Sequence, residues 1–162
     1  MAESRFTINL SGKTALVTGG SIGIGKASAL AVACCGADVA VTYLSRPTEA
    51  EETAQAIRAL GVKGVAYKLD ASDPAQVETV AQQAAGKLGG HIDILVNNAG
   101  SLLKRVPIAE MSIEHWRQTM AVNLDSCFYV TRAVLPYMNR GWGRIVNMSS
   151  VAARNGGGAG AA

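Results

Sequence analysis

Short runs rich in β-branched residues alternate with longer segments of helical pattern along this 162-residue chain. Such alternation is typical of βαβ units, in which helices connect parallel strands. We expect strands over residues 14–18, 38–43, 63–69, 92–97 and 144–148, and helices over about 23–35, 48–60, 73–88 and 112–138. The pattern predicts an α/β domain with a doubly wound parallel sheet and helices on both faces.

Three of the expected helices carry a recognisable start signal. Thr48 and Glu51 have the spacing of a capping box, so Thr48 is predicted to cap the helix 48–60. Asp73, followed by Pro and then Gln76, predicts the start of the helix 73–88. Ser112 is expected to cap the long helix that ends near residue 138, with a bend at Pro136.

Composition excludes several classes of protein. Hydrophobic residues make up 49% of the chain and charged residues 17%, which excludes an intrinsically disordered chain. The formal net charge of +3 is too small and too dispersed to suggest a nucleic-acid partner. No apolar run approaches the ~18 residues of a membrane span. We therefore expect neither nucleic acid nor membrane as a partner.

The cysteines and the first residues indicate a cellular location. Cys34, Cys35 and Cys127 form neither a disulfide framework nor a metal-ligand spacing. The first ten residues lack the apolar core of a signal peptide. We expect a cytoplasmic protein without a metal site.

A glycine-rich segment, Thr18–Gly25 (TGGSIGIG), lies between the first strand and the first helix. Gly19 can form the tight turn, Gly23 lets the backbone approach a pyrophosphate, and Gly25 permits close packing of helix and strand. The N–H groups at the helix start then face the anion. The glycine spacing differs from the G-x-G-x-x-G of the usual dinucleotide-binding motif. A P-loop is excluded because no Gly-Lys-Ser/Thr follows. A tight turn without ligand remains an alternative.

Five motifs in register resemble the short-chain dehydrogenase/reductase family, including members similar to 3-oxoacyl acyl-carrier-protein reductases. They are Thr18–Gly25, Asp70, Asn97–Gly100 (NNAG), Asn123 and Ser149-Ser150. The resemblance covers essentially all 162 residues and implies a Rossmann-type fold with strand order 3-2-1-4-5. We expect residues 1–162 to be the N-terminal portion of a single dinucleotide-binding domain, with the C-terminal strands missing. Gly156–Ala162, which contains only Gly and Ala, is expected to be a mobile loop.

The resemblance implies a cofactor role for each matching residue. The pyrophosphate loop would consist of Gly19, Ser21, Ile22, Gly23, Ile24 and Gly25. Asp70 would accept a hydrogen bond from the adenine amino group, with Ala71 beside it. Asn97, Ala99 and Gly100 would line the adenosine ribose side and stabilise the sheet. Alternatively, Asp70 begins a turn and the two asparagines form a turn at a strand end.

The end of the second strand predicts the choice of cofactor. An acidic residue there would bond the ribose 2′-OH of NAD and repel a 2′-phosphate. Here Tyr43 occupies that position, Ser45 and Arg46 follow, and the next acidic residue is Glu49. Ser45 can donate a hydrogen bond and Arg46 can pair with a phosphate, so we predict NADP(H) over NAD(H). The first loop lacks the Arg that many NADP-preferring relatives carry. Alternatively, Arg46 is a solvated loop charge.

The resemblance also implies catalytic residues. Ser150 would orient the substrate, and Asn123 would hold a water for proton relay. The family pattern places a Tyr thirteen residues after that Ser and a Lys four residues later, at 163 and 167, beyond this sequence. We therefore expect hydride transfer between NADP(H) and a carbonyl or alcohol substrate in the whole protein. Loss of a general acid costs ~10²–10⁴ in rate, so these 162 residues alone should be nearly inactive.

Two other functions remain open at this point. Without the Tyr and Lys, the chain is alternatively a truncated, non-catalytic nucleotide-binding or partner subunit. An NAD-dependent oxidation enzyme is a further alternative. The family's long helix often forms a subunit interface, so the resemblance implies a homodimer or homotetramer that acts on a small molecule.

Overall fold

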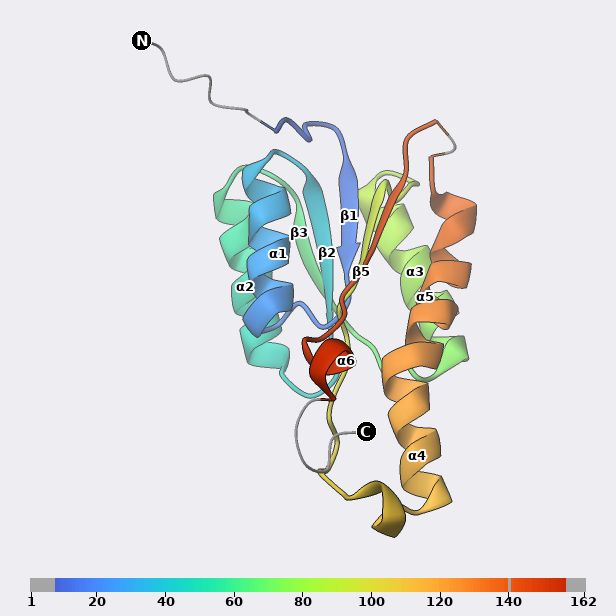
Figure 1. Ribbon diagram of the computed structural model, residues 1–162. Coiled ribbons are helices and arrows are strands. Elements are labelled where there is room, and N and C mark those ends of the chain that lie inside the picture. The colour runs from blue at the N-terminus through green and yellow to red at the C-terminus, as the bar shows by residue number, and fades with distance from the viewer. Residues whose placement is uncertain (1–7, 140, 157–162) are drawn as a thin grey trace.

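The computed structural model of the protein describes residues 8–139 and 141–156. Its centre is one sheet of five parallel strands (Figure 1). The strands are β1 (Thr14–Val17), β2 (Asp38–Tyr43), β3 (Gly64–Lys68), β4 (Ile94–Asn97) and β5 (Arg144–Asn147). Their order is β3-β2-β1-β4-β5, which confirms the predicted doubly wound order.

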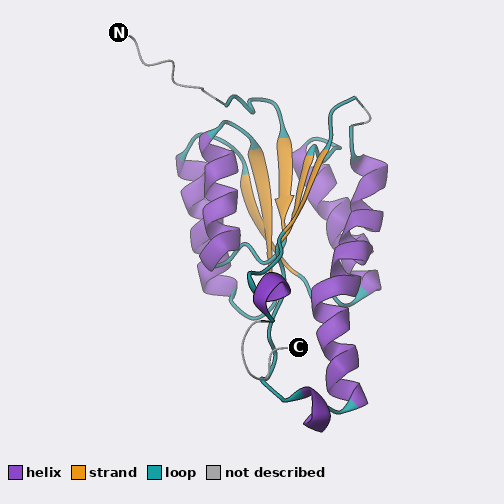
Figure 2. Ribbon diagram, viewed as in Figure 1, coloured by secondary structure: helices purple, strands orange, loops and turns teal. Residues whose placement is uncertain are grey.

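Helices cover both faces of the sheet (Figure 2). The elements are α1 (Gly23–Cys34), α2 (Pro47–Ala59), α3 (Pro74–Leu88), α4 (Ile113–Met120), α5 (Ser126–Val134) and the short α6 (Ala152–Asn155). One apolar cluster joins Leu16 and Leu95 to α3 and α5, and a second joins Val17 and Val39 to α1 and α2. Because both faces are buried, β1 is apolar along most of its length rather than alternating with polar residues.

The helix α3 begins as predicted at the N-cap residue Asp73. Its Oδ1 accepts hydrogen bonds from the backbone N–H groups of Ala75 (2.9 Å) and Gln76 (3.2 Å). The side-chain amide of Gln76 donates to Oδ2 at 2.8 Å. These bonds favour the ionised carboxylate, so the pKa of Asp73 lies below its ordinary value, chiefly through the backbone N–H of Gln76.

We expect Asp73→Ala to lower the melting temperature by a few degrees at neutral pH, because two N–H groups of α3 lose their acceptor. A group with a lowered folded-state pKa contributes stability above its unfolded pKa, about 3.9 for Asp, and loses it as pH falls through the folded value. The difference between wild type and Asp73→Ala should therefore shrink in thermal melts below about pH 4. Asp73→Ser keeps an oxygen at the N-cap and is the control; equal losses for Ser and Ala would contradict the capping role.

The prediction that Thr48 caps α2 is wrong. The helix begins one residue earlier, at Pro47, and the N-cap is Arg46, which makes no side-chain capping bond. Proline is favoured at the first helical position because its fixed φ suits the helix and its missing N–H removes an unpaired donor. Thr48 therefore lies inside the first turn, where its backbone is helical and it cannot act as N-cap.

The segment predicted as one long helix changes its hydrogen-bonding pattern three times. Ser112 caps it as predicted, since its Oγ accepts from the backbone N–H of His115 at 3.1 Å. A π-helical stretch, Ala121–Asp125, then separates α4 from α5, and a 3-10 turn over Leu135–Tyr137, which contains Pro136, ends the segment. π-helical turns inside α-helices frequently occur at functional sites. This one contains the predicted site residue Asn123.

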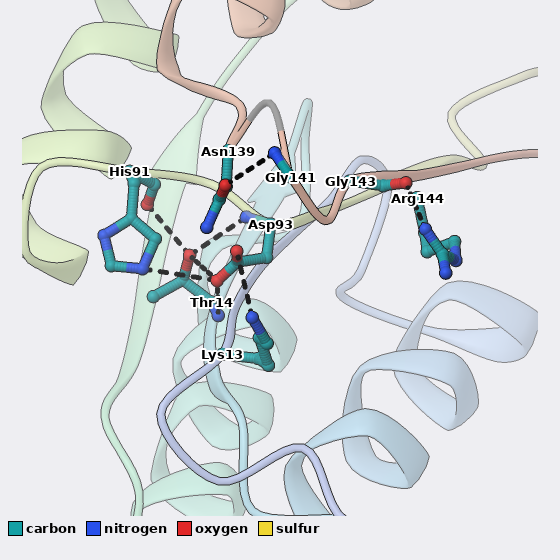
Figure 3. A network of polar contacts seen from close by, with 8 residues as sticks. All are labelled: Lys13, Thr14, His91, Asp93, Asn139, Gly141, Gly143 and Arg144. Atoms are coloured by element: carbon teal, nitrogen blue, oxygen red, sulfur yellow. Dashed lines mark hydrogen bonds and ion pairs between the residues drawn. The ribbon is translucent and has the colours of Figure 1, made fainter.

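A buried carboxylate joins β1 to β4 at their amino ends (Figure 3). Asp93 is 1% exposed, and its Oδ2 accepts from the backbone N–H of Thr14 (3.1 Å) and lies 3.2 Å from Nε2 of His91. Its Oδ1 faces Nζ of Lys13 at 3.6 Å. The contact between Asp93 and Thr14 stabilises the pairing of β1 with β4. The glycine-rich segment follows the carboxyl end of β1, so this cluster lies at the opposite edge of the sheet from it.

Within residues 8–139 and 141–156, no helix is long and apolar enough to span a bilayer. The loop predicted over Gly156–Ala162 lies outside the described residues apart from Gly156, which has φ +74°.

Candidate functional site

Two adjoining cavities lie at the carboxyl edge of the sheet, where open α/β folds bind ligands. Their volumes are about 550 and 570 Å³. Both are lined by Ile24, Asn98, Ala99 and Gly100. We call the one beside the glycine-rich segment the loop cavity and the one beside β5 the serine cavity.

The segment 18–25 needs glycine for two different reasons, backbone conformation at some positions and lack of space for a Cβ at another. Gly19 and Gly23 have φ values of +64° and +57°, in the left-handed region that favours glycine. A Cβ at Gly23 would meet nothing within 4 Å, so the backbone there faces open space. At Gly25 a Cβ would collide with the carbonyl oxygen of Gly19. The segment thus presents an open backbone turn packed closely on the start of α1, as predicted.

Side chains from β1 and from the β4 loop hold the glycine turn in place. The buried Thr18 hydroxyl accepts from the backbone N–H groups of Asn98 and Ala99, both at 2.9 Å. The Asn98 amide donates to the carbonyl oxygens of Thr18 (2.9 Å) and Gly19 (3.1 Å). The turn is therefore fixed to the loop after β4 before any ligand binds.

A second anchor, which the sequence reasoning missed, is Thr42 at the end of β2. Its hydroxyl accepts from the N–H of Gly19 at 3.2 Å, and its carbonyl accepts from the N–H of Gly20 at 2.8 Å. The signal in the sequence was a polar residue directly after the apolar run 39–41 of β2. On its own that signal does not reveal which loop the threonine contacts.

All but two of the predicted cofactor residues line the loop cavity. They are Gly19, Ser21, Ile22, Ile24, Gly25, Tyr43, Ser45, Arg46, Asp70, Ala71, Ala99 and Gly100. Gly23 and Asn97 are the two that do not. The structure thus brings the ends of β1, β2, β3 and β4 to one concave site.

The side chain of Asn97 is buried away from the loop cavity. Its Nδ2 donates to Asn147 Oδ1 (2.8 Å) on β5 and to Thr131 Oγ1 (3.0 Å) on α5. These bonds agree with the expected stabilisation of the sheet. The next residue, Asn98, lines the cavity in its place.

Asp70 lines the loop cavity and also forms a turn. Its Oδ1 accepts from the backbone N–H of Ser72 (2.9 Å) and from the Ser72 hydroxyl (2.6 Å). An ionised carboxylate has a second acceptor oxygen. The two interpretations of Asp70, as turn residue and as cavity residue, are therefore compatible.

The serine cavity contains both predicted catalytic residues, Asn123 and Ser150. The Asn123 amide is engaged by the backbone of Ser101: Oδ1 accepts from its N–H at 2.9 Å, and Nδ2 donates to its carbonyl at 2.8 Å. The exposed Ser150 Oγ accepts from the N–H of Ala152 at 3.1 Å, which leaves its own O–H as a donor. Asn123 thus fixes the loop after β4, and Ser150 offers a hydroxyl at the cavity.

In the part of the chain that the structure describes, no group of three or more His, Cys, Asp or Glu side chains could hold a metal ion. The polar groups that line the two cavities are backbone amides, hydroxyls, carboxamides, the carboxylate of Asp70, the guanidinium of Arg46 and the thiol of Cys127.

The fold and the glycine turn define an α/β dinucleotide-binding type of domain. The family model of the short chain dehydrogenases matches residues 13–162, and the chain belongs to that family. It is 39% identical over 147 residues to the oxidoreductase YhxC of Bacillus subtilis, covering 91% of this chain and 51% of the relative. The L-rhamnose 1-dehydrogenase (NADP(+)) of Thermoplasma acidophilum is 35% identical, with 93% of this chain and 59% of that protein covered.

Solved structures show the same arrangement. A short chain dehydrogenase from Burkholderia cenocepacia in complex with NADP is 37% identical, with a TM-score of 0.87 over 94% of this chain and 61% of that one. A blue fluorescent protein from a metagenomic library in complex with NADPH is 41% identical, with a TM-score of 0.87 over 94% and 62%. The chain spans about half the length of the curated relatives it matches.

Proposed function

We propose that this chain binds NADP(H) in the loop cavity and that the whole protein transfers a hydride between it and a carbonyl or alcohol substrate in the serine cavity. The observation that carries the proposal is the junction of the two cavities at Asn98, Ala99 and Gly100. A dinucleotide on the glycine turn would occupy the loop cavity, and this junction would connect it to the cavity that Ser150 and Asn123 line.

The residues present fit such a cofactor. The turn at Gly23 leaves the backbone open to a pyrophosphate, whose charge the N-terminus of α1 favours. Ser45 and Arg46 line the loop cavity at the end of β2, and Tyr43 stands where a carboxylate would repel a 2′-phosphate. The solved relatives in complex with NADP and with NADPH, and the L-rhamnose 1-dehydrogenase (NADP(+)), support the same cofactor.

Residues of this chain have separate roles in the proposed reaction. When bound, the nicotinamide supplies or accepts the hydride. The Ser150 hydroxyl donates to the carbonyl oxygen and polarises it, while Asn123 holds the Ser101 segment beside it. The oxygen that becomes negative also needs a proton donor. The Tyr of the family pattern, at 163, would need the Lys at 167 to act near neutral pH, since an unperturbed Tyr has a pKa near 10.

The test is to titrate the chain with NADPH and with NADH, and then to add small ketones and aldehydes to the whole protein. We expect tighter binding of NADPH and oxidation of NADPH that depends on the carbonyl compound. Ser150→Ala should lower kcat/KM at least about tenfold, because one hydrogen-bond donor to the reacting oxygen is lost, and leave the Kd for NADPH unchanged. Ser149→Ala is the neighbouring control.

The second candidate is a non-catalytic nucleotide-binding or partner subunit. It is favoured by one observation: none of the four tyrosines is followed four residues later by a lysine. NADPH binding without turnover by the whole protein would support this candidate. Binding of neither dinucleotide would contradict both.

We also propose a cytoplasmic homodimer or homotetramer in which residues 1–162 are the N-terminal portion of one dinucleotide-binding domain. The proposed location is supported by three cysteines that form no disulfide, Cys34, Cys35 and Cys127, as is usual in a reducing compartment.

The proposed contact between subunits is supported by three exposed apolar side chains on the segment 112–138, those of Trp116, Leu124 and Phe128.

A further inference from the structure

Arg46, the cation at the mouth of the loop cavity, already has a partner. It is the N-cap residue of α2, and its Nη1 donates to Oε1 of Glu49, in the first turn of that helix, at 2.9 Å. The two side chains are 54% and 36% exposed. Arg46 lines the cavity beside Ser45, whereas Glu49 is not among the lining residues. Glu49 therefore contacts the guanidinium without contacting the cavity.

The carboxylate of Glu49 is held in its ionised form. Its pKa is lowered first by a hydrogen bond from its own backbone N–H and then by the hydrogen bond from Arg46. The N-terminus of a helix also favours negative charge in its first turn. Near neutral pH a full negative charge thus lies against the one guanidinium that lines the loop cavity.

A ribose 2′-phosphate and Glu49 would compete for this cation. Both are anions that form charge-assisted hydrogen bonds with a guanidinium. With Glu49 present, a phosphate would approach an Arg46–Glu49 ion pair whose net charge is close to zero. One N–H group of Arg46 also already donates to Glu49. NAD(H), which carries no charge at this position, is not subject to the competition.

We infer that Glu49 limits the preference of this site for a 2′-phosphorylated dinucleotide by pairing with Arg46. Glu49 is thus a positioning residue that sets cofactor specificity through the arginine. The inference rests on the proposed function, because it assumes that the loop cavity holds the dinucleotide with its adenosine ribose beside Ser45 and Arg46.

The test is Glu49→Gln, which removes the charge and keeps the shape. In fluorescence titrations at low ionic strength, we expect the Kd for NADPH to fall about three- to tenfold, as for removal of one repulsive charge a few ångströms from a phosphate. The Kd for NADH should stay within about twofold, since no phosphate is involved. The gain should diminish in high salt, which screens exposed charges.

The chain offers a closely matched control on the same helix. Glu51 pairs with Arg58 (Oε1–Nη2, 2.5 Å), and neither residue lines the loop cavity. Glu51→Gln changes the net charge of α2 by the same amount, so it should leave the ratio of the two Kd values unchanged. An equal gain in Glu51→Gln would overturn the inference, because the effect would then reflect net charge.

A double-mutant cycle tests whether Glu49 acts through Arg46. In the Arg46→Ala background, Glu49→Gln should no longer tighten NADPH binding. A gain of the same size in that background, or no gain in the Arg46 protein, would overturn the inference. The proposed function fails in a different way: the unmutated chain would then bind neither NADPH nor NADH.

Discussion

Replacing Gly23 with Val is expected to abolish binding of NADPH while the domain still folds. The backbone of Gly23 has φ +57°, where a β-branched residue is strained by about 1–2 kcal/mol. That cost is small beside the 5–15 kcal/mol by which folded domains are stable. Apart from the neighbouring backbone of the turn and of α1, no atom lies within 4 Å of the added Cβ, so the branched side chain would enter the open space in which we propose the pyrophosphate. We expect the Kd to rise more than about a hundredfold, or over 2.7 kcal/mol.

Gly61→Val is the matched control for this substitution. Gly61 follows α2, has φ +86°, and also leaves a Cβ nothing to meet within 4 Å. Its neighbours Leu60 and Val62 do not line the loop cavity, whereas Ile22 and Ile24, on either side of Gly23, do. Both variants should lose similar stability in urea denaturation, and only Gly23→Val should lose binding in titrations with NADPH. Retained binding by Gly23→Val would show that the glycine turn does not hold the pyrophosphate.

Placing a carboxylate at the end of β2 is expected to move cofactor preference from NADPH toward NADH. In Tyr43→Asp the carboxylate would stand where it can accept from a ribose 2′-OH and repel a 2′-phosphate. In Arg46→Asp the attractive charge is lost, and a second acidic group joins Glu49. We expect each substitution to change the ratio of the two Kd values about a hundredfold toward NADH, which corresponds to about 2.7 kcal/mol.

The measurement is a pair of titrations, one with each dinucleotide, for each variant. Lys87→Asp, in the last turn of α3 and outside the loop cavity, makes the same change in net charge as Arg46→Asp and should leave the ratio unchanged. Unaltered NADPH affinity in both Tyr43→Asp and Arg46→Asp would mean that no 2′-phosphate is bound at the end of β2.

Much of the backbone was predictable from local sequence. The range of β2 was predicted to the residue. The predicted β3 is one residue too long at each end, and the other three strands differ by one or two residues at one end. Asp73 was correctly identified as a cap because Pro74 and Gln76 both agree with it. Thr48 failed because Pro47 starts α2 one residue earlier. The π-helical stretch around Asn123 was not predicted, since helix periodicity does not distinguish i→i+4 from i→i+5 bonding.

The candidate site also has a part that could be predicted from local sequence and a part that could not. Local sequence predicts that a glycine turn follows the first strand and that polar residues follow the later strands, because both features depend on neighbouring residues. Strand pairing in the folded chain is what places Asn98, and not Asn97, at the loop cavity. Successive side chains at a strand end point to opposite faces, so adjacent asparagines have different partners. Those partners lie far away in sequence, at Thr18 and Asn147, and strand order and register bring them together.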